Sequence, residues 1–357
     1  NQLGNYAYEK SKAKYFDSRL SWEFGTLTLD SYTHWYENQF NYTRNRNKNI
    51  WNLYKITDLG YDFNGSKKYS TASSTFGFSF ARKSITGISI DELQIDRMSC
   101  YLGLEKFTDY LYIDVGINTT FFSEYGWNYS PGYSITYSLT DKLNLYHSYD
   151  RGFRIPTVFE LFASNQEFTG SEDLNLENTN TFSYGLDVND KIFSIDLSFF
   201  QKKTENAIDW IYSENSKTWV ASNINKVSTN GHKLFSEVNV SELPYLSFLS
   251  FLSIGYTYID IEFSEEKNYR FLSNYLKNQF ILSFNYPLFF GVNQSWVVRY
   301  ESSEMMGERW IGDSQINIPL WKFDMSYSIE NIMDVKYQDE FGVDLAGRWM
   351  KFNIQYN

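Results

Sequence analysis

The sequence has little of the residues that build disulfide frameworks, linkers and spanning helices. Its one cysteine, Cys100, excludes an internal disulfide and a cysteine-based zinc site. Only 5 of its 357 residues are proline, and no proline-rich boundary divides the chain. No apolar run approaches the roughly 18 residues that a spanning helix needs, which argues against a helical membrane protein. We therefore expect one continuous domain over residues 1–357.

Basic residues and histidines are also scarce. Lys and Arg total 32 against 43 Asp and Glu, a net charge of −11, and there is no basic stripe for nucleic acid. The three histidines, His34, His147 and His232, are scattered, whereas zinc sites need clustered ligands. No Ser/His/Asp arrangement or phosphate-cradling glycine loop stands out. We therefore expect no nucleic-acid partner, no cofactor or bound metal, and no enzymatic activity.

Aromatic residues, in contrast, make up 20% of the chain, with 30 Tyr, 30 Phe and 10 Trp. Aromatic side chains concentrate in β-strands. Mean hydropathy is nevertheless low. This combination is typical of a transmembrane β-barrel, because only one face of each strand meets lipid and aromatic girdles mark both interfaces. A large soluble β-protein would also be rich in strands, so composition alone leaves both classes open.

Apolar and polar residues alternate with a period of two in many segments, which indicates strands. Cys100 lies in the alternation Met98, Cys100, Leu102, so we expect it to be a small apolar residue on a strand face. The second face carries Gly, Ser, Asn, Asp and Tyr, which suits a wet lumen. The alternation is clearest in residues 16–24, 76–80, 111–118, 193–199, 322–329 and 350–356.

Short and long connections alternate along most of the chain. A membrane barrel does this, with tight periplasmic turns and long outer loops. We therefore predict an antiparallel up-and-down barrel with about 17 strands, residues 51–63 and 219–241 being ambiguous. The short connections are Gly25 and residues 107–109, 140–142, 189–190 and 320–322. The long ones are residues 40–50, 84–94, 122–131, 153–176, 263–272, 303–311 and 332–347.

Strand polarity suggests that this barrel is incomplete. If loop 153–176 is external, alternation makes both the first and the last strand run toward the periplasm. Single-chain bacterial barrels have an even number of strands, so two inward ends require at least one more strand before Asn1. Plugged transporters have about 22 strands. We therefore expect these residues to be the C-terminal part of a longer barrel protein, incomplete at the N-terminal side.

Three sequence motifs follow one another between residues 142 and 357. The first opens the loop after segment 142–149, the second closes that loop, and the third precedes the last alternating segment. Their residues are Gly152, Phe153, Arg154, Pro156, Glu160 and Leu161; then Asp173, Leu174 and Glu177; then Asn331, Asp334, Tyr337, Gly347 and Arg348. In order and spacing these motifs resemble those of TonB-dependent outer-membrane receptors, although both prolines of the second family motif are missing.

The resemblance implies a receptor in the bacterial outer membrane that imports a scarce ligand through a plugged barrel. Outer-membrane lipid and the TonB complex are then the expected partners of a monomer; the plug and the TonB contact lie outside this sequence. The motif residues have architectural readings. Pro156 fixes φ after a strand end, Arg154 can pair with Glu160, and Asn331 and Asp334 suit a turn.

The family's ligands include ferric siderophores, cobalamin, haem and some sugars. Haem receptors usually carry a histidine between the two loop motifs, and none lies between Phe153 and Leu176. A ferric siderophore or cobalamin is therefore the expected ligand. Arginine and aromatic side chains suit an anionic, ring-bearing chelate, although an interfacial girdle would use the same residue types. The candidate ligand contacts in outer loops are Arg44, Arg46, Tyr125, Trp127, Tyr129, Arg309 and Trp310.

Two other classes of protein fit the sequence less well. A passive porin would share the strand pattern but would lack a plug. A soluble β-rich adhesin would also alternate, but it has no reason to alternate short and long connections. Membrane fractionation and bilayer conductance distinguish these classes from a gated importer.

Overall fold

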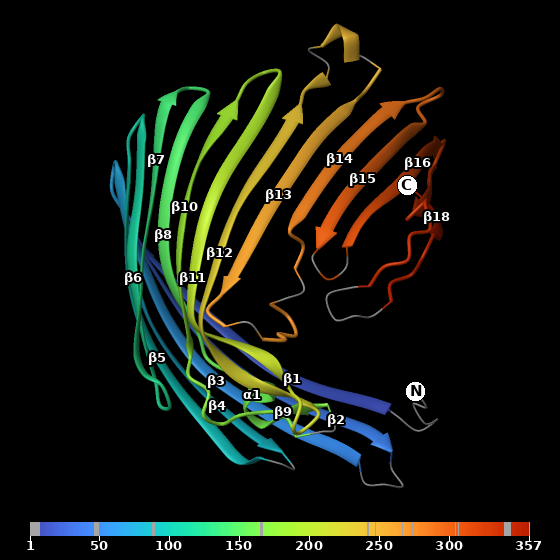
Figure 1. The fold of residues 1–357 in the computed structure, drawn as a ribbon. Coiled ribbons are helices and arrows are strands. Elements are labelled where there is room, and N and C mark those ends of the chain that lie inside the picture. The colour runs from blue at the N-terminus through green and yellow to red at the C-terminus, as the bar shows by residue number, and fades with distance from the viewer. Residues whose placement is uncertain are drawn as a thin grey trace. The chain divides into compact units, whose positions relative to one another are not determined.

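The computed structural model describes residues 8–45, 50–87, 90–164, 167–240, 243–246, 248–265, 267–272, 275–303, 305, 307–338 and 344–356 (Figure 1). Their contacts divide the chain into two compact units. Unit 1 comprises Asn1–Ile135 and Asp150–Asn178, and unit 2 comprises Thr136–Tyr149 and Thr179–Asn357. Within the described ranges, no helix has the length and hydropathy that crossing a membrane requires.

The first six strands of unit 1 form an antiparallel ladder in chain order. The turn between the first two strands includes Gly25 at φ 62°, a left-handed conformation that glycine adopts without strain. Helix α1 (Val158–Phe162) and strand β9 (Phe168–Thr169) complete the unit. The six strands are β1 (Tyr8–Phe24), β2 (Leu27–Asn45), β3 (Ile50–Lys68), β4 (Ala72–Gly87), β5 (Ile90–Phe107) and β6 (Leu111–Phe122).

Unit 2 continues the antiparallel pattern, and each strand from β11 to β18 pairs with the next. β7 (Gly126–Thr140) and β8 (Leu143–Arg154) contribute residues to both units, as does the start of β10. The remaining strands are β10 (Glu177–Asn189), β11 (Phe193–Ser213), β12 (Thr218–Val238), β13 (Phe251–Phe263), β14 (Asn278–Pro287), β15 (Asn293–Ser303), β16 (Gly307–Leu320), β17 (Phe323–Glu330) and β18 (Trp349–Tyr356), with a 3₁₀ turn at Pro244–Leu246.

In the described residues these strands make an 18-stranded sheet. This confirms the all-β antiparallel fold class and agrees with the expected count of about 17 strands. The two ambiguous segments belong to β3 and β12. The short connections also stand where the sequence places them, for example at Trp321, which turns at φ 56°.

Four of the predicted long loops are wrong. Loop 40–50 is mostly strand, because β2 runs to Asn45 and β3 begins at Ile50. Loop 303–311 is also mostly strand, because β15 runs to Ser303 and β16 begins at Gly307. Most of 84–94 is strand, because β4 runs to Gly87 and β5 begins at Ile90. The predicted loop 122–131 shrinks to a turn at residues 123–125, because β7 begins at Gly126. In β7 Trp127 and Tyr129 still alternate with polar residues, whereas at 84–94 the backbone ladder continues through polar residues such as Ser84 and Gln94. Period-two hydrophobicity therefore marks the apolar part of a strand and misses its polar extension.

The two faces of the unit 1 sheet differ sharply in chemistry. One cross-strand row reads Trp22, Leu29, Gly65, Phe76, Leu102, Ile117, and the adjacent row reads Ser21, Asp30, Asn64, Gly77, Tyr101, Asn118. We call the first side the apolar face and the second the polar face. Phe76, Leu102 and Ile117 are exposed on the apolar face, and Cys100 is exposed beside Phe78 there. A soluble domain rarely exposes such a row.

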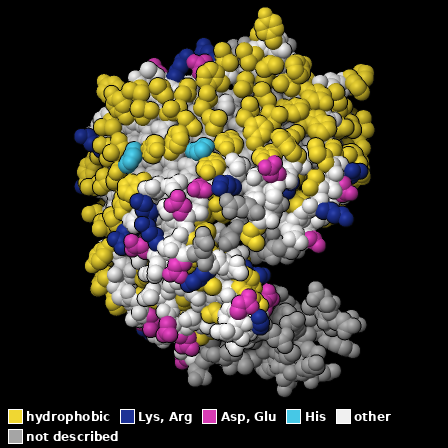
Figure 2. All heavy atoms as spheres, viewed as in Figure 1, with side chains coloured by type: hydrophobic (Ala, Val, Ile, Leu, Met, Phe, Trp, Pro, Cys, Tyr) yellow, Lys and Arg dark blue, Asp and Glu magenta, His cyan; other side chains and the backbone are white. Residues whose placement is uncertain are grey.

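Unit 2 has the same division. From β11 to β18 one row reads Phe193, Val238, Leu252, Phe284, Trp296, Ser314, Ile329, Met350. The neighbouring row reads Ser194, Glu237, Ser253, Ser283, Val297, Asp313. Figure 2 shows hydrophobic side chains gathered in the upper part of the view, with charged side chains concentrated below them. A belt of exposed apolar and aromatic side chains is the surface that a bilayer requires.

On the polar face of unit 1, Gly77 lies between two side chains that meet above it. Tyr101 Oη donates a hydrogen bond to Asn64 Oδ1 at 3.1 Å. A Cβ at position 77 would lie 2.1 Å from Tyr101 Cε1. Gly77 therefore allows the Tyr101 ring to lie along the sheet, a close approach that only glycine permits.

The segment that follows β13 folds back onto β11. The carboxylate of Asp209, 1% exposed, accepts hydrogen bonds from the backbone N–H groups of Phe271 (3.2 Å) and Leu272 (2.9 Å). Tyr269 packs beside Ala207 in a small buried apolar cluster, and burial raises the pKa of its phenol. This connection is therefore anchored to the strand by one buried carboxylate and an apolar contact.

Candidate functional site

The first motif forms a capped helical turn at the end of β8. Thr157 caps α1: its Oγ1 accepts the N–H of Glu160 at 3.2 Å, and Glu160 Oε2 accepts the N–H of Thr157 at 2.6 Å. This reciprocal capping box satisfies backbone donors that a helix start leaves open. Pro156 is buried immediately before the cap, where its fixed φ sets the exit from the strand.

Arg154 connects the first motif to the second. Its guanidinium donates to Glu160 Oε2 and Oε1 at 2.8 and 3.1 Å. It also donates to Glu177 Oε2 and Oε1 at 2.9 and 2.8 Å. Both carboxylates are largely buried, while the Arg154 side chain is 40% exposed. The guanidinium thus makes two bidentate ion pairs, and its hydrogen-bonding capacity is used within the protein.

The loop between these motifs, which we call the signature loop (residues 152–177), has a small core of its own. Leu161 and Leu174 are buried at 8% and 5% exposure. Gly170 donates its N–H to Ala163 O at 2.7 Å, and a Cβ there would lie 2.6 Å from Leu161 O. Phe153 packs edge-on against Phe122. Gly152 has open space around it, and Asp173 is exposed.

The third motif forms a turn held by side-chain hydrogen bonds. Asn331, at φ 51° and 3% exposed, exchanges two hydrogen bonds with Val335: its Nδ2 donates to Val335 O at 2.8 Å, and its Oδ1 accepts the Val335 N–H at 2.9 Å. Asp334, at φ 54°, accepts the backbone N–H of Arg348 at 2.7 Å. A Cβ at Gly347 would lie 2.4 Å from Asp334 Oδ1.

Arg348 hydrogen-bonds to the backbone of the third motif. Its Nε donates to the carbonyl of Ile332 at 3.0 Å. All three motifs are therefore satisfied largely by contacts inside their own loops. Such residues position the chain and have little capacity left for a ligand.

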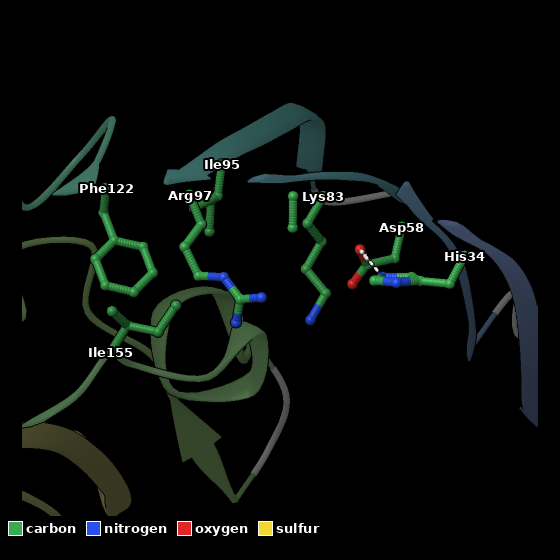
Figure 3. Close-up of a pocket in the computed structure, with 8 residues that line it drawn as sticks. His34, Asp58, Lys83, Ile95, Arg97, Phe122 and Ile155 are labelled. Atoms are coloured by element: carbon green, nitrogen blue, oxygen red, sulfur yellow. Dashed lines mark ion pairs between the residues drawn. The ribbon is translucent and has the colours of Figure 1, made fainter. Parts of the chain in front are cut away.

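A cavity of about 140 Å³ opens on the polar face of unit 1 near Ile155, just after β8 (Figure 3). Lys83 and Arg97 extend into it from β4 and β5, and His34 and Asp58 lie at one end. Phe122 and Ile155 form an apolar wall at the other end. The cavity is lined by His34, Asp58, Ala81, Lys83, Ile95, Arg97, Phe122 and Ile155.

The charges in this cavity are only partly matched. His34 Nε2 lies 3.7 Å from Asp58 Oδ1, and His34 Nδ1 lies 3.8 Å from Asp62 Oδ2. Asp58 Oδ1 is buried without a hydrogen bond. In the described part of the chain, Lys83 and Arg97 make no ion pair with a carboxylate. Two cations beside an apolar wall can hold an anionic group that carries a ring or an alkyl part.

The candidate ligand contacts predicted from the sequence do not lie on one face. Tyr125 packs on Phe122, and burial raises the pKa of its phenol. Trp127 and Tyr129 are exposed strand residues, and Trp127 packs on Phe121. Arg44 belongs to β2, and Arg46 lies outside the described residues.

Arg309 and Trp310 are neighbours in β16 and point to opposite faces. Arg309 pairs with Glu301 at 2.7 Å, both largely buried, and lies over the Tyr337 ring at 4.6 Å. It lines a cavity of about 460 Å³ with Lys336 and Tyr337. Trp310 is 50% exposed against Tyr300. Of this pair, Arg309 therefore lies on the polar face and Trp310 on the apolar face.

Sequence reasoning missed Lys83, Arg97, His34 and Asp58. The signal was available in part, because these residues occupy the polar positions of alternating segments. Their gathering depends on the register of four strands, and no local pattern fixes that register. Among the described residues, no cluster of three or more His, Cys, Asp or Glu could hold a metal ion.

A family model described as TonB dependent receptor-like, beta-barrel matches residues 1–355. The chain therefore belongs to the TonB-dependent receptor family, whose members are transport receptors of the outer membrane. This agrees with the resemblance found in the three motifs. No curated protein matches the chain in sequence.

Several solved structures share the fold. The siderophore receptor PirA from Acinetobacter baumannii aligns with TM-score 0.80 at 11% identity, over 98% of this chain and 62% of that one. The FrpB iron transporter from Neisseria meningitidis aligns with TM-score 0.78 at 12% identity, over 98% and 63%. The ferric-catecholate import receptor Fiu from Escherichia coli K12 aligns with TM-score 0.71 at 15% identity, over 99% and 65%. The chain thus spans under two thirds of the length of these receptors.

Proposed function

We propose that the protein takes part in importing a ferric siderophore across the bacterial outer membrane. The observation that carries this proposal is the family match over residues 1–355. The names of the similar structures, which include siderophore receptors and an iron transporter, favour a ferric chelate over cobalamin. In this proposal the apolar face meets lipid and the polar face lines the lumen. Coupling to the TonB complex, and a monomeric state, are part of the same proposal.

The cavity of Lys83 and Arg97 is our candidate for a ligand contact. Siderophore complexes are commonly anionic, and the cavity offers two cationic side chains next to Phe122 and Ile155. Carboxylate or catecholate oxygens would accept hydrogen bonds from the guanidinium and the ammonium group. Arg309 and Tyr125 remain candidate contacts from the predicted set, because each lies near a cavity or a buried ring.

Growth of a deletion strain tests the import proposal. The strain lacking the gene is supplied with iron as tricatecholate, trihydroxamate or citrate complexes, and separately with cobalamin as the required corrinoid. Restored growth on one ferric chelate, only when the gene and a functional TonB complex are both present, is the expected result. Growth restored by cobalamin alone would show that the ligand is cobalamin and not a ferric chelate. Growth restored by none of these compounds would overturn the import proposal.

Paired variants test the ligand contact. The double variant Lys83→Gln/Arg97→Gln is expected to weaken binding of the active chelate by about 10-fold or more, because each charged hydrogen bond contributes about 1.5–3 kcal/mol. The matched control is Lys67→Gln/Lys106→Gln, which removes two charges from the apolar face near the other ends of β3 and β5. Equal affinities of the two double variants for the chelate would show that this cavity does not contact the ligand.

The passive porin is the competing function. A porin would show a steady conductance in a planar bilayer, whereas a plugged importer would stay closed. The purified protein as made by the cell is the sample for this measurement. A steady open conductance together with growth that needs no TonB would favour the porin.

A further inference from the structure

Charged side chains begin at a sharp boundary on the apolar face of unit 1. On β1 the position beyond Phe16 on this face is Lys14, which pairs across the ladder with Glu37, the position beyond Trp35. On β4 and β5, Arg82 and Asp96 face each other. They stand next to Phe80 and Met98 on the same face. β1, β2, β4 and β5 thus change from apolar to charged within about one residue pair of the same level, and on β3, which lies between β2 and β4, Thr57 separates Leu59 from Lys55.

The charges beyond this boundary have an excess of cations. Glu37 binds two lysines, Lys14 at 3.0 Å and Lys55 at 2.9 Å. Arg82 makes a bidentate pair with Asp96, Nε to Oδ1 at 2.7 Å and Nη2 to Oδ2 at 2.8 Å. We call the four cations on this face, Lys12, Lys14, Lys55 and Arg82, the cationic row. Two carboxylates face four cations, although the whole chain carries a net charge of −11.

The cationic row is open to a partner. The side chains of Lys14, Lys55 and Arg82 are 69%, 51% and 49% exposed. Asp96 occupies one edge of the Arg82 guanidinium, so the edge that carries Nη1 can still donate to an oxyanion. Glu37 holds its two lysines in place beside the last apolar residues. The row is therefore ordered and keeps hydrogen-bond donors for negative groups.

We propose that the cationic row binds the phosphate groups of anionic lipid headgroups at the membrane boundary. This rests on the proposed placement of the apolar face in lipid. Where the apolar belt ends, the headgroup layer begins, and cations there are attracted to anionic lipid by about fivefold in affinity per lysine or arginine. The occupant is lipid phosphate, and the row selects it over neutral headgroups.

Lipid titration of the purified protein tests this proposal. Dioctanoyl phosphatidic acid is titrated against the protein in neutral detergent, with dioctanoylglycerol as the lipid that lacks phosphate. In the variant Lys12→Gln/Lys14→Gln, Glu37 keeps Lys55, so no carboxylate loses its last partner. Its affinity for phosphatidic acid is expected to fall by about 25-fold, while affinity for dioctanoylglycerol stays unchanged.

Lys67→Gln/Lys106→Gln is the matched control, with the same loss of charge on the same face near the opposite ends of the strands. Its affinity for phosphatidic acid is expected to match that of the unmodified protein. Unchanged affinity in Lys12→Gln/Lys14→Gln, or an equal loss in the control, would overturn the proposal. In the unmodified protein, raising the salt concentration must also weaken binding of phosphatidic acid, since ion pairs at a surface are screened. No siderophore enters these measurements, so their outcome is independent of the import assay.

Discussion

Arg154, the last residue of β8, holds Glu177, the first residue of β10, through two parallel hydrogen bonds of 2.9 and 2.8 Å. The signature loop leaves the sheet at one of these residues and returns at the other. The same guanidinium also donates two hydrogen bonds to the carboxylate of Glu160 inside the loop. One side chain therefore closes the base of the loop and fixes the helical turn within it.

Glu177→Gln is expected to loosen the signature loop without unfolding the sheet. The amide keeps one acceptor but loses the charge, at a cost of about 1–3 kcal/mol for a charged hydrogen bond. Hydrogen exchange of the Leu161 and Gly170 amides should accelerate, while exchange in β4 stays unchanged. The exposed Glu172→Gln is the control, and similar exchange rates in both variants would contradict the closing role.

Substitution by alanine should destabilise the signature loop at Gly170 and have no effect at Gly152. Gly170→Ala would place a Cβ 2.6 Å from Leu161 O, a backbone clash that the loop must relieve by moving. Overpacking of this kind costs about 1–3 kcal/mol. Gly152→Ala meets nothing within 4 Å and should be neutral. Limited proteolysis of the loop compares the two variants, and equal cleavage rates would show that the close approach at Gly170 has no effect.

Asp209 should control the order of the connection after β13. Asp209→Ala removes a carboxylate acceptor of the Phe271 and Leu272 amides, and the loss of a hydrogen bond to a charged group costs about 1.5–3 kcal/mol. Asp209→Asn keeps one acceptor oxygen, so the exchange rates of the two amides in this variant should lie between those of Asp209→Ala and the unmodified protein. Hydrogen-exchange rates of the two amides measure the effect. The control variant is Asp141→Asn, which changes an exposed turn residue. Faster exchange of these amides in Asp209→Asn than in Asp209→Ala would contradict the hydrogen-bond explanation.

The turn after β10 should lose stability in acid. A hydrogen bond from Lys142 Nζ lowers the pKa of the Asp190 carboxyl below its ordinary value. A depressed pKa means that the pair stabilises the turn above the unfolded-state pKa of about 4, and that this contribution disappears as pH falls through the lower folded-state value. Lys142→Gln should move the Asp190 pKa upward, as followed by carboxyl carbon chemical shifts. An unchanged titration in that variant would exclude Lys142 as the cause.

Trp310→Ala is expected to leave affinity for the chelate unchanged, although Trp310 was a candidate from sequence. It lies on the face opposite to its neighbour Arg309, which lines a cavity with Tyr337. Loss of the exposed ring should instead weaken retention in the membrane fraction, as for other interfacial aromatic residues. Binding of the chelate to detergent-purified protein separates the two effects, and a large loss of affinity would place Trp310 in the ligand site.

Strand class and strand number could be predicted from sequence because alternation is a local property. Alternating residues such as Leu111, Ile113 and Val115 indicate which face of a strand is apolar. Short turns such as the one at Gly25 separate the segments. The polar ends of β4 and β5 could not be found in this way. Their hairpin is held by backbone hydrogen bonds, which leave no mark in hydrophobicity.

The candidate site was predictable only in part, for a related reason. Arg154 and Glu160 are close in sequence, so their pairing could be suggested from spacing. Glu177 joins them only when β8 and β10 frame one loop. Lys83 and Arg97 come together through cross-strand register, which a single sequence does not encode visibly.

The Tyr101 ring lies along the sheet over Gly77, and this keeps the side chain close to the polar face of unit 1. If residue 77 carried a methyl group, the ring would have to rotate away from Asn64 and stand upright from the sheet. If, as proposed, the polar face lines the lumen, the absence of a methyl group at Gly77 lets this stretch of wall lie closer to the sheet.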